Sequence, residues 1–249
     1  MTTAHYVELH CHSNFSFLDG ASHPEQLIAR AAELDYPALA ITDHNGLYGI
    51  VRFSQAALQK GIKPIFGAEI TLDNDSHLLL LVKDNIGYAN LSQLLSRAQL
   101  DNEKGNARAT YDMLDTYHNG LIALSGCQLG EVPKALLQED YKSAEIIASR
   151  YHELFGQDNF YLELQHHNLP THEILCEQLI RLGKNLNLPL VATNNVHYAH
   201  PENRPLQDVL TCIKGHTTLD KANDLLYPNA ERCLKSAEQM ARRFKHVPE

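Results

Sequence analysis

The sequence lacks the marks of a secreted or membrane-bound protein. Its five cysteines are an odd number, scattered without a Cys-x-x-Cys pair, which fits a reducing compartment better than a disulfide framework. No apolar run approaches the length of a membrane-spanning helix, and the N-terminal residues MTTAHYVEL do not resemble a signal peptide. We therefore expect a cytoplasmic protein that does not bind a membrane.

Positive charge is also in short supply. The 21 lysines and arginines are outnumbered by 30 aspartates and glutamates, so the formal net charge is -9 at pH 7. This balance argues against a broad basic surface for nucleic acid, and any contact with DNA is expected to be local or mediated by metal ions. A cluster of bound cations would offset part of the negative charge.

The chain also lacks a GxGxxG motif, an internal repeat and a low-complexity segment. What it contains is an ordinary globular composition, 44% hydrophobic and 20% charged, over 249 residues. That length suits one large α/β barrel or two smaller domains, with a core that needs no disulfides.

Short apolar runs alternate with amphipathic segments through most of the chain. The strand-like runs are Tyr6–Leu9, Ala38–Thr42, Lys63–Gly67, Leu78–Val82, Leu121–Ser125, Phe160–Leu164 and Leu188–Thr193. The expected helices are Pro24–Leu34, Leu47–Leu58, Tyr88–Ala98, Val132–Leu137, Tyr141–Phe155, His172–Leu186, Pro205–Ile213 and Ser236–Phe244. This alternation predicts parallel strands covered by helices. A barrel is favoured over a doubly wound sheet, because no GxGxxG follows the first strand.

Local signals refine this outline. The pattern Ser22-x-x-Glu25 predicts a capping box at the start of the first helix, and Gly61 is expected to end the second helix. The polar stretch Asp101–Thr110 is expected to be an exposed loop. The tail Thr217–Glu249 does not fit the alternation, so we expect it to pack outside the barrel.

Two histidines, His10 and His12, follow the first strand-like run. In an extended backbone, residues two apart point to the same side, so both imidazoles aim at one point past the strand end. Neutral imidazole is a common ligand of zinc and similar metals. Taken alone, the pair also fits one packed and one solvated histidine.

Side chains that can bind metals also follow most of the remaining expected strands. They are Asp43 and His44, Glu69, Cys127, His166 and His167, and Asn195 and His197, with Asp19 in the loop after the first strand. In barrel enzymes the functional residues lie at the carboxyl ends of the strands, whereas random placement would scatter them over both faces. The distribution therefore predicts a site for several metal ions at that face.

The motifs LHCHS, AITDHNGLYG, FGAE, SGC and ATNNVHY resemble those of the PHP (polymerase and histidinol phosphatase) domain. The chain is most similar to the N-terminal part of bacterial C-family DNA polymerase III alpha subunits. Within these, ELHCHSNFSFLDGASHPEQL, HYAHPENRPLQDVL and LLYPNAERCLKSAEQM resemble the error-prone polymerase branch. The resemblance implies a single PHP domain over residues 1–249, in which residues 216–249 form an extension toward a polymerase region expected beyond Glu249.

The resemblance further implies a distorted seven-stranded (β/α) TIM-like barrel with a metal cluster at the carboxyl ends of its strands. That cluster would hold two to three divalent ions of zinc, manganese or iron. The matching positions that would bind them are His10, His12, Asp19, His44, Glu69, His77, Cys127, Asn195 and His197.

Several of these positions have plainer interpretations. Asp19 also fits a turn residue, and Cys127 also fits a small buried residue. His77 begins an expected strand, so it reaches the other ligands only if that strand runs against its neighbours. Cys11, between the two histidines, points the other way and is expected in the core.

Three more residues are expected beside the metals. Asp43 is expected to orient an imidazole rather than to bind a metal itself. His166 and His167 would either contact a phosphate near the metals or be solvated.

Clustered divalent metals suit phosphoester hydrolysis, because they lower the pKa of a bound water molecule and neutralise charge on the phosphate. The resemblance therefore implies a metal-dependent phosphoesterase that acts as a 3′–5′ exonuclease on a DNA end. Its partners would be the rest of the polymerase chain and replication or repair proteins.

One departure from the family leaves other functions open. Family members with a full metal set read Asp-x-His where this chain reads Asn195-Val196-His197. An amide oxygen can coordinate a metal but lacks the charge of a carboxylate. The alternatives are a non-catalytic, metal-stabilised structural module of an error-prone polymerase and a small-molecule phosphatase of the histidinol-phosphate type.

Overall fold

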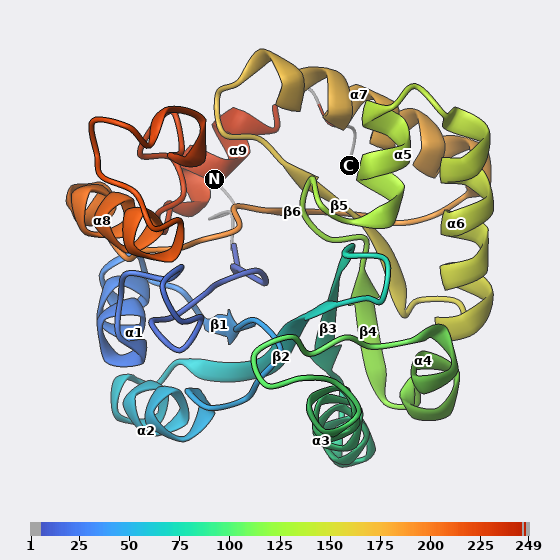
Figure 1. Cartoon of the computed structure of the whole chain (residues 1–249), viewed down its shortest axis with the longest axis horizontal. Coiled ribbons are helices and arrows are strands. Elements are labelled where there is room, and N and C mark those ends of the chain that lie inside the picture. Colours follow the sequence, from blue (N-terminus) through green and yellow to red (C-terminus); the bar gives the residue numbers. More distant parts are fainter. Residues whose placement is uncertain (1–5, 246, 248–249) are drawn as a thin grey trace. The chain divides into compact units, whose positions relative to one another are not determined.

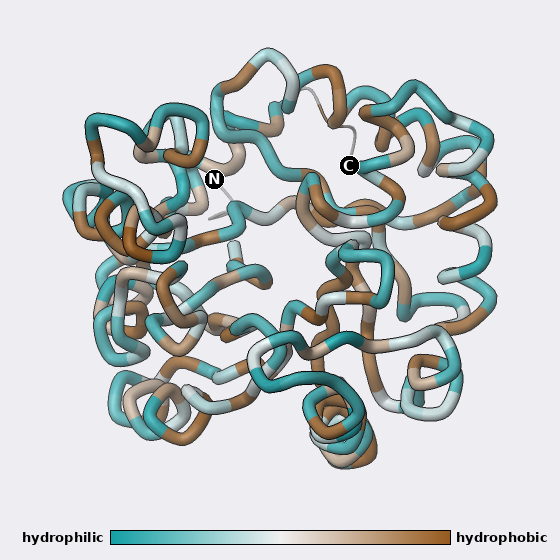
Figure 2. Tube along the Cα trace, in the orientation of Figure 1, coloured by the Kyte–Doolittle hydropathy of each residue, from teal (hydrophilic) through white to brown (hydrophobic). Residues whose placement is uncertain are grey.

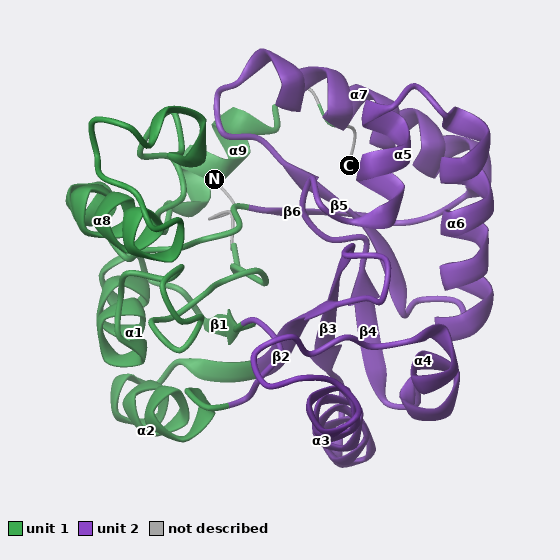
Figure 3. Cartoon of the chain, viewed as in Figure 1, with its two compact units in different colours: residues 1–43, 48–65, 194–249 green, residues 44–47, 66–193 purple. Residues whose placement is uncertain are grey.

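The structure, a computed structural model, describes residues 6–245 and 247. The chain divides into two compact units, which Figure 3 colours separately. Unit 1 comprises residues 1–43, 48–65 and 194–249, and unit 2 comprises residues 44–47 and 66–193. The assignment of residues 1–249 to a single domain stays a prediction.

The described residues contain six strands, which are hydrogen-bonded to one another in chain order (Figure 1). Their bounds are β1 Ala38–Ile41, β2 Lys63–Thr71, β3 His77–Val82, β4 Leu121–Leu124, β5 Phe160–Gln165 and β6 Leu190–Thr193. Each corresponds to an expected run. The predicted count of seven is wrong for the described part of the chain, because Tyr6–Leu9 is not a strand.

Residues 8–12 are nevertheless extended and hydrogen-bonded on both sides within unit 1. On one side, Ala40 N donates to Glu8 O at 2.9 Å, and on the other His12 N donates to Val196 O at 2.8 Å. The N–H groups of His10 and Cys11 are satisfied by side chains, those of Glu8 and Thr42 respectively. Side-chain acceptors therefore replace part of the ladder that a regular strand would form.

The expectation of parallel strands is wrong for β3. This strand pairs antiparallel with β2 and with β4, whereas β4, β5 and β6 are parallel. Only residues 72–76 join β2 to β3, which is too short for a parallel crossover. His77, the first residue of β3, was expected to reach the other ligands only if its strand ran against its neighbours. The direction of β3 meets this condition.

The helices agree closely with the sequence pattern. Their bounds are α1 Pro24–Glu33, α2 Ile50–Lys60, α3 Asn85–Leu100, α4 Tyr111–Tyr117, α5 Glu131–Leu137, α6 Tyr141–Phe155, α7 Pro170–Leu186, α8 Arg204–Lys214 and α9 Ala237–Arg243. Short 3-10 helices span Pro201–Asn203 and Asn223–Leu225. Helix α4 was not predicted, because its seven residues are too few to show a helical period.

The predicted capping box of α1 is displaced by one residue. Gln26, not Glu25, returns its side-chain oxygen to the helix start, where it accepts from His23 N at 2.8 Å. Ser22 instead accepts from Ala199 N at 2.9 Å. The sequence pattern could not show this tertiary contact, which removes Ser22 from the cap. Gly61 ends α2 in the left-handed conformation, as predicted.

Hydrophobic burial explains the continuous apolar run of β3 and the helical periodicity of α6. All four leucines of β3, Leu78 to Leu81, are buried, and the buried residues of α6 recur at helical spacing, from Ala144 to Phe155. In Figure 2 the tube of α6 accordingly alternates between hydrophilic and hydrophobic residues. Among the described residues, no helix combines the length and apolar character needed to cross a membrane.

Within unit 1, the C-terminal tail is hydrogen-bonded to the segment that contains Asn195 and His197, and its expected packing outside a barrel stays a prediction. Within unit 1, His197 N donates to Arg232 O at 2.9 Å, and Tyr198 forms a β-bridge with Cys233. The side chain of Asn194 donates to the carbonyl oxygens of Glu231 and Cys233, both at 2.7 Å. Residues 231–233 therefore run along residues 194–198.

Candidate metal-binding residues

In unit 2, the buried carboxylate of Glu69 lies between two imidazoles. Its Oε2 is 3.2 Å from Nδ1 of His44, and its Oε1 is 3.2 Å from Nδ1 of His77. One ligand atom from each of the three residues lies within 4.8 Å of the others. The group therefore gathers two nitrogen donors and a carboxylate around one point.

Strand pairing produces this convergence. Antiparallel pairing sets Thr71 opposite His77 and Glu69 opposite Leu79, so Glu69 and His77 are diagonal neighbours on one face. On the other side of β2, His44 forms a parallel bridge with Glu69. Asn45 anchors this loop, because its N–H donates to Glu69 O and its side-chain oxygen accepts from Thr71 N, both at 2.9 Å.

Cys127 lies beside the same group, with its Sγ 3.7 Å from Nδ1 of His77. The turn that carries it depends on Gly126, which has a φ of +84°. A Cβ at that position would come within 2.9 Å of His77 O. Glycine therefore allows the Ser125-Gly126-Cys127 turn to approach the histidine closely.

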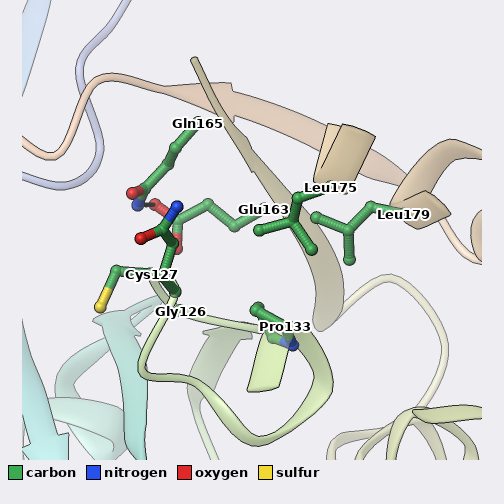
Figure 4. Close-up of a pocket in the computed structure, with 8 residues that line it drawn as sticks. Gly126, Cys127, Pro133, Glu163, Gln165, Leu175 and Leu179 are labelled. Carbon is green, nitrogen blue, oxygen red and sulfur yellow. Dashed lines mark hydrogen bonds between the residues drawn. The ribbon is translucent and has the colours of Figure 1, made fainter. Parts of the chain in front are cut away.

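A small pocket opens next to Cys127 in unit 2. Figure 4 shows Cys127, Glu163 and Gln165 among the residues that line it. Glu163 is buried and accepts from Gln165 Nε2 at 2.8 Å and from the hydroxyl of Thr193. Neither Glu163 nor Gln165 was predicted as a site residue. Their alternation with leucines in β5 is a signal that they share a face.

The two histidines after β5 lie in different settings. His167 is buried, and its ring contacts that of His172 at a centroid distance of 5.0 Å. His166 is partly exposed and its Nδ1 accepts from Asn168 N at 3.3 Å. Their expected contact with phosphate stays a prediction.

In unit 1, His10 and His12 turn their imidazoles toward each other. Their Nε2 atoms are 3.1 Å apart and both side chains are buried. This agrees with the expected orientation of residues two apart in extended backbone. Cys11 between them is fully buried, as expected, and burial raises the pKa of its thiol well above the usual value.

Asp43 holds His12 through a serine. Ser16 donates its hydroxyl hydrogen to Asp43 Oδ1 at 2.7 Å, and the same hydroxyl oxygen is 3.1 Å from Nδ1 of His12. Because the only hydrogen of that hydroxyl goes to Asp43, the Nδ1–H of His12 donates to Ser16. The lone pair of His12 then lies on Nε2, the atom that faces His10. Ser16 is an intermediary between Asp43 and His12 that the sequence did not reveal, and the expected role of Asp43 in orienting a metal-binding imidazole stays a prediction.

His197 is oriented by the backbone. Its Nδ1–H donates to Asn195 O at 2.9 Å, which leaves Nε2 to face Asp19 Oδ1 at 3.5 Å. Asn195 adopts a positive φ of 42°, a conformation that asparagine tolerates better than most residues. The two facing atoms, an imidazole nitrogen and a carboxylate oxygen, are both of kinds that bind metal ions. The donor set therefore fits a cation.

Unit 1 also contains a buried carboxylate, Glu8, that was not predicted as a site residue. Glu8 accepts from the N–H groups of His10 and Asn194, both at 2.9 Å, and from the Tyr6 hydroxyl at 2.8 Å. Burial raises its pKa to about 7, against the opposing effect of these hydrogen bonds. A charged residue inside an otherwise apolar run was the available signal.

The chain is similar to part of curated bacterial proteins that are named as DNA polymerases. An error-prone DNA polymerase from Symbiobacterium thermophilum is 42% identical over 260 residues, covering 98% of this chain and 24% of that protein. A DNA polymerase III subunit alpha from Treponema pallidum is 38% identical over 263 residues, covering all of this chain and 22% of that protein. The chain thus spans about a quarter of the length of these relatives.

Solved structures share the fold at low identity. A protein described as a metal-dependent phosphoesterase, from Bifidobacterium adolescentis, matches with a TM-score of 0.53 at 15% identity, over 99% of this chain and 98% of its own. An amidohydrolase from Chromobacterium violaceum matches with a TM-score of 0.55 at 16% identity, over 77% of this chain and 87% of its own. These likenesses confirm the predicted α/β fold class.

The family model for the PHP domain matches residues 8–167, which contain the Leu-His-Cys-His motif, His44, Glu69, His77 and Cys127. The match covers well over half of the chain. The chain therefore belongs to the PHP domain family.

Proposed function

We propose that this chain is the PHP domain of a DNA polymerase III alpha subunit of the error-prone branch, and that it binds metals used in phosphoester hydrolysis. The polymerase context is supported by identities of 34% to 42% with proteins of those names, across nearly the whole chain. DNA synthesis, translesion synthesis, replication and repair partners, and a cytoplasmic location are all part of this proposal.

The placement of Glu69 between His44 and His77 carries the metal proposal. Two imidazole nitrogens and a carboxylate, with the Cys127 thiol alongside, suit zinc, manganese or iron. In unit 1, we assign a second ligand group to His10, His12, Asp19, Asn195 and His197. Together the two groups would hold about two to three divalent ions.

Divalent ions bound there would lower the pKa of a water molecule and neutralise charge on a phosphate. The tasks of the side chains follow from their contacts. Glu69 supplies a negative charge between the two flanking imidazoles. Asp43, through Ser16, keeps Nε2 of His12 as the donor atom. The substrate we favour is the 3′ end of a DNA strand, with His166 and His167 as candidate phosphate contacts.

Metal content and hydrolysis test this function together. We expect the purified chain to contain divalent metal by elemental analysis and to shorten a 5′-labelled oligonucleotide from its 3′ end with manganese or zinc. His12→Ala and Glu69→Ala should lose both metal and activity. Metal-independent cleavage retained in these variants would reject the proposal. Turnover of a phosphomonoester in preference to the oligonucleotide would instead indicate a small-molecule phosphatase.

The neutral amide of Asn195 favours a second candidate, a metal-stabilised structural module of the polymerase. The metals would then stabilise the folded state, because the free energy of metal binding adds to that of folding. Removal of metal with a chelator should lower the melting temperature in either case. A wild-type chain that is metal-stabilised but hydrolyses neither substrate would support this second function.

A further inference from the structure

The tail residue Tyr227 lies against His197 in unit 1, outside residues 8–167 that match the family model. The two rings are 5.4 Å apart in an edge-on arrangement, and the Tyr227 hydroxyl is 3.4 Å from Nε2 of His197. Since Nδ1–H of His197 donates to Asn195 O, the hydroxyl donates to Nε2 in the neutral ring.

Two arginines hold Tyr227 in this position. The guanidinium of Arg232 lies over its ring, 4.0 Å from the centroid, and Arg204 donates to its carbonyl oxygen at 2.7 Å. Arg232 belongs to the segment that hydrogen-bonds along residues 194–198. The phenol is therefore fixed to the same backbone that positions His197, and its ring is half-buried.

The surroundings of the hydroxyl suit an anion that arrives with metal ions. Arg232 supplies positive charge over the Tyr227 ring, and Lys214 Nζ lies 4.0 Å from Oδ2 of Asp19, whose Oδ1 faces Nε2 of His197. The nitrogen that Tyr227 faces is the one that His197 would offer to a metal. With that nitrogen engaged, the hydroxyl can donate to an oxygen held beside it.

We propose that Tyr227 is a substrate-contacting residue whose hydroxyl donates to a non-bridging oxygen of the phosphoester. This inference rests on the proposed phosphoesterase function and extends it to the tail. It assigns the tail a part in substrate binding in addition to its packing role.

Tyr227→Phe tests the proposal, because it removes only the hydroxyl and keeps the ring over which Arg232 lies. Tyr88→Phe, at a partly exposed position in α3 of unit 2, is the matched control. We expect the metal content of both variants to equal that of the wild type. In Tyr227→Phe alone, the Kd of inorganic phosphate for the metal-loaded protein, measured by calorimetry, should rise about tenfold or more, as should KM for the oligonucleotide.

Unchanged phosphate affinity and KM in Tyr227→Phe would overturn the inference and leave the proposed function intact. A loss of bound metal in that variant would also overturn it, because Tyr227 would then act on His197 rather than on substrate. If the wild type hydrolyses nothing, the proposed function fails, and the phosphate titration still tests whether Tyr227 contacts a bound phosphate. Weaker phosphate binding by the variant supports the contact, whereas equal or absent binding in both proteins rejects it.

Discussion

Nδ1 of His77 lies 3.2 Å from Oε1 of Glu69, although His77 begins β3 and Glu69 lies in the second half of β2. The antiparallel direction of β3 brings them together, because it returns the start of one strand to the end of the other. His44 approaches the same carboxylate from the other side. One buried side chain thus connects three separate segments of unit 2.

Replacing Glu69 by Gln should therefore remove metal from the unit 2 group. The change keeps the size of the side chain but removes its charge, so we expect metal affinity there to fall by more than about 100-fold. Loss of a residue that only hydrogen-bonds to a metal ligand already weakens metal binding by about 10–100-fold. Competition with a chromophoric chelator measures the change. Glu33→Gln, at an exposed position in α1, is the control, and equal metal affinity in both variants would contradict the assignment.

Most of this unit could be predicted from local patterns. The bounds of α6 match the sequence prediction, and the buried leucines of β3 identify it as a strand. The direction of β3 could not be predicted, since an apolar run does not show which strands it pairs with or whether it pairs parallel or antiparallel. Likewise, Glu163 and Gln165 enter the pocket through tertiary pairing of β5, so their role was not visible in the sequence.

Asp43→Asn should disturb the unit 1 ligands without removing one. Asp43 accepts from Ser13 N and from the hydroxyls of Ser13 and Ser16, at 2.7 to 2.8 Å. An amide cannot accept all three, so we expect a loss of about 1–3 kcal/mol in the free energy of unfolding. Metal affinity should fall by about 10–100-fold, because His12 loses its orientation.

Two further variants separate these effects. Ser16→Ala breaks only the link to His12, so it should weaken metal binding with a smaller loss of stability. Asp73→Asn, at an exposed position in unit 2, should change neither property. Unaltered metal binding in both Asp43→Asn and Ser16→Ala would show that the link does not orient a metal ligand.

In unit 1, too, local sequence patterns indicate only part of the candidate site. The pair His10 and His12 was predictable from a two-residue spacing, and Asp43 from its place beside His44. Their connection through Ser16, and the support from Glu8 and Asn194, depend on contacts between distant segments. Tyr227 lies 30 residues after its partner His197, and no local pattern indicated that contact.

Glu8→Ala should destabilise the metal-free protein. Its carboxylate accepts from the buried N–H groups of His10 and Asn194, and each donor left without an acceptor costs about 1–3 kcal/mol. We expect the free energy of unfolding, measured by urea titration with a chelator present, to fall by about 2–5 kcal/mol. Glu33→Ala is the exposed control. A loss below about 1 kcal/mol would mean that water or a rearranged backbone satisfies these donors.

Asn195→Asp should strengthen the unit 1 ligand group. Aspartate tolerates the positive φ of this position, and it adds the charge that the amide lacks. We expect metal affinity and oligonucleotide hydrolysis each to rise about tenfold, an increase that corresponds to about 1.4 kcal/mol. Asn187→Asp is a matched control, because Asn187 is an exposed asparagine that also has a positive φ, of 54°. Hydrolysis that appears only in Asn195→Asp would favour the structural module as the function of the wild-type chain. Unchanged metal affinity would show that residue 195 does not face a metal. The amide of Asn195 would then be no reason to expect weak metal binding in unit 1.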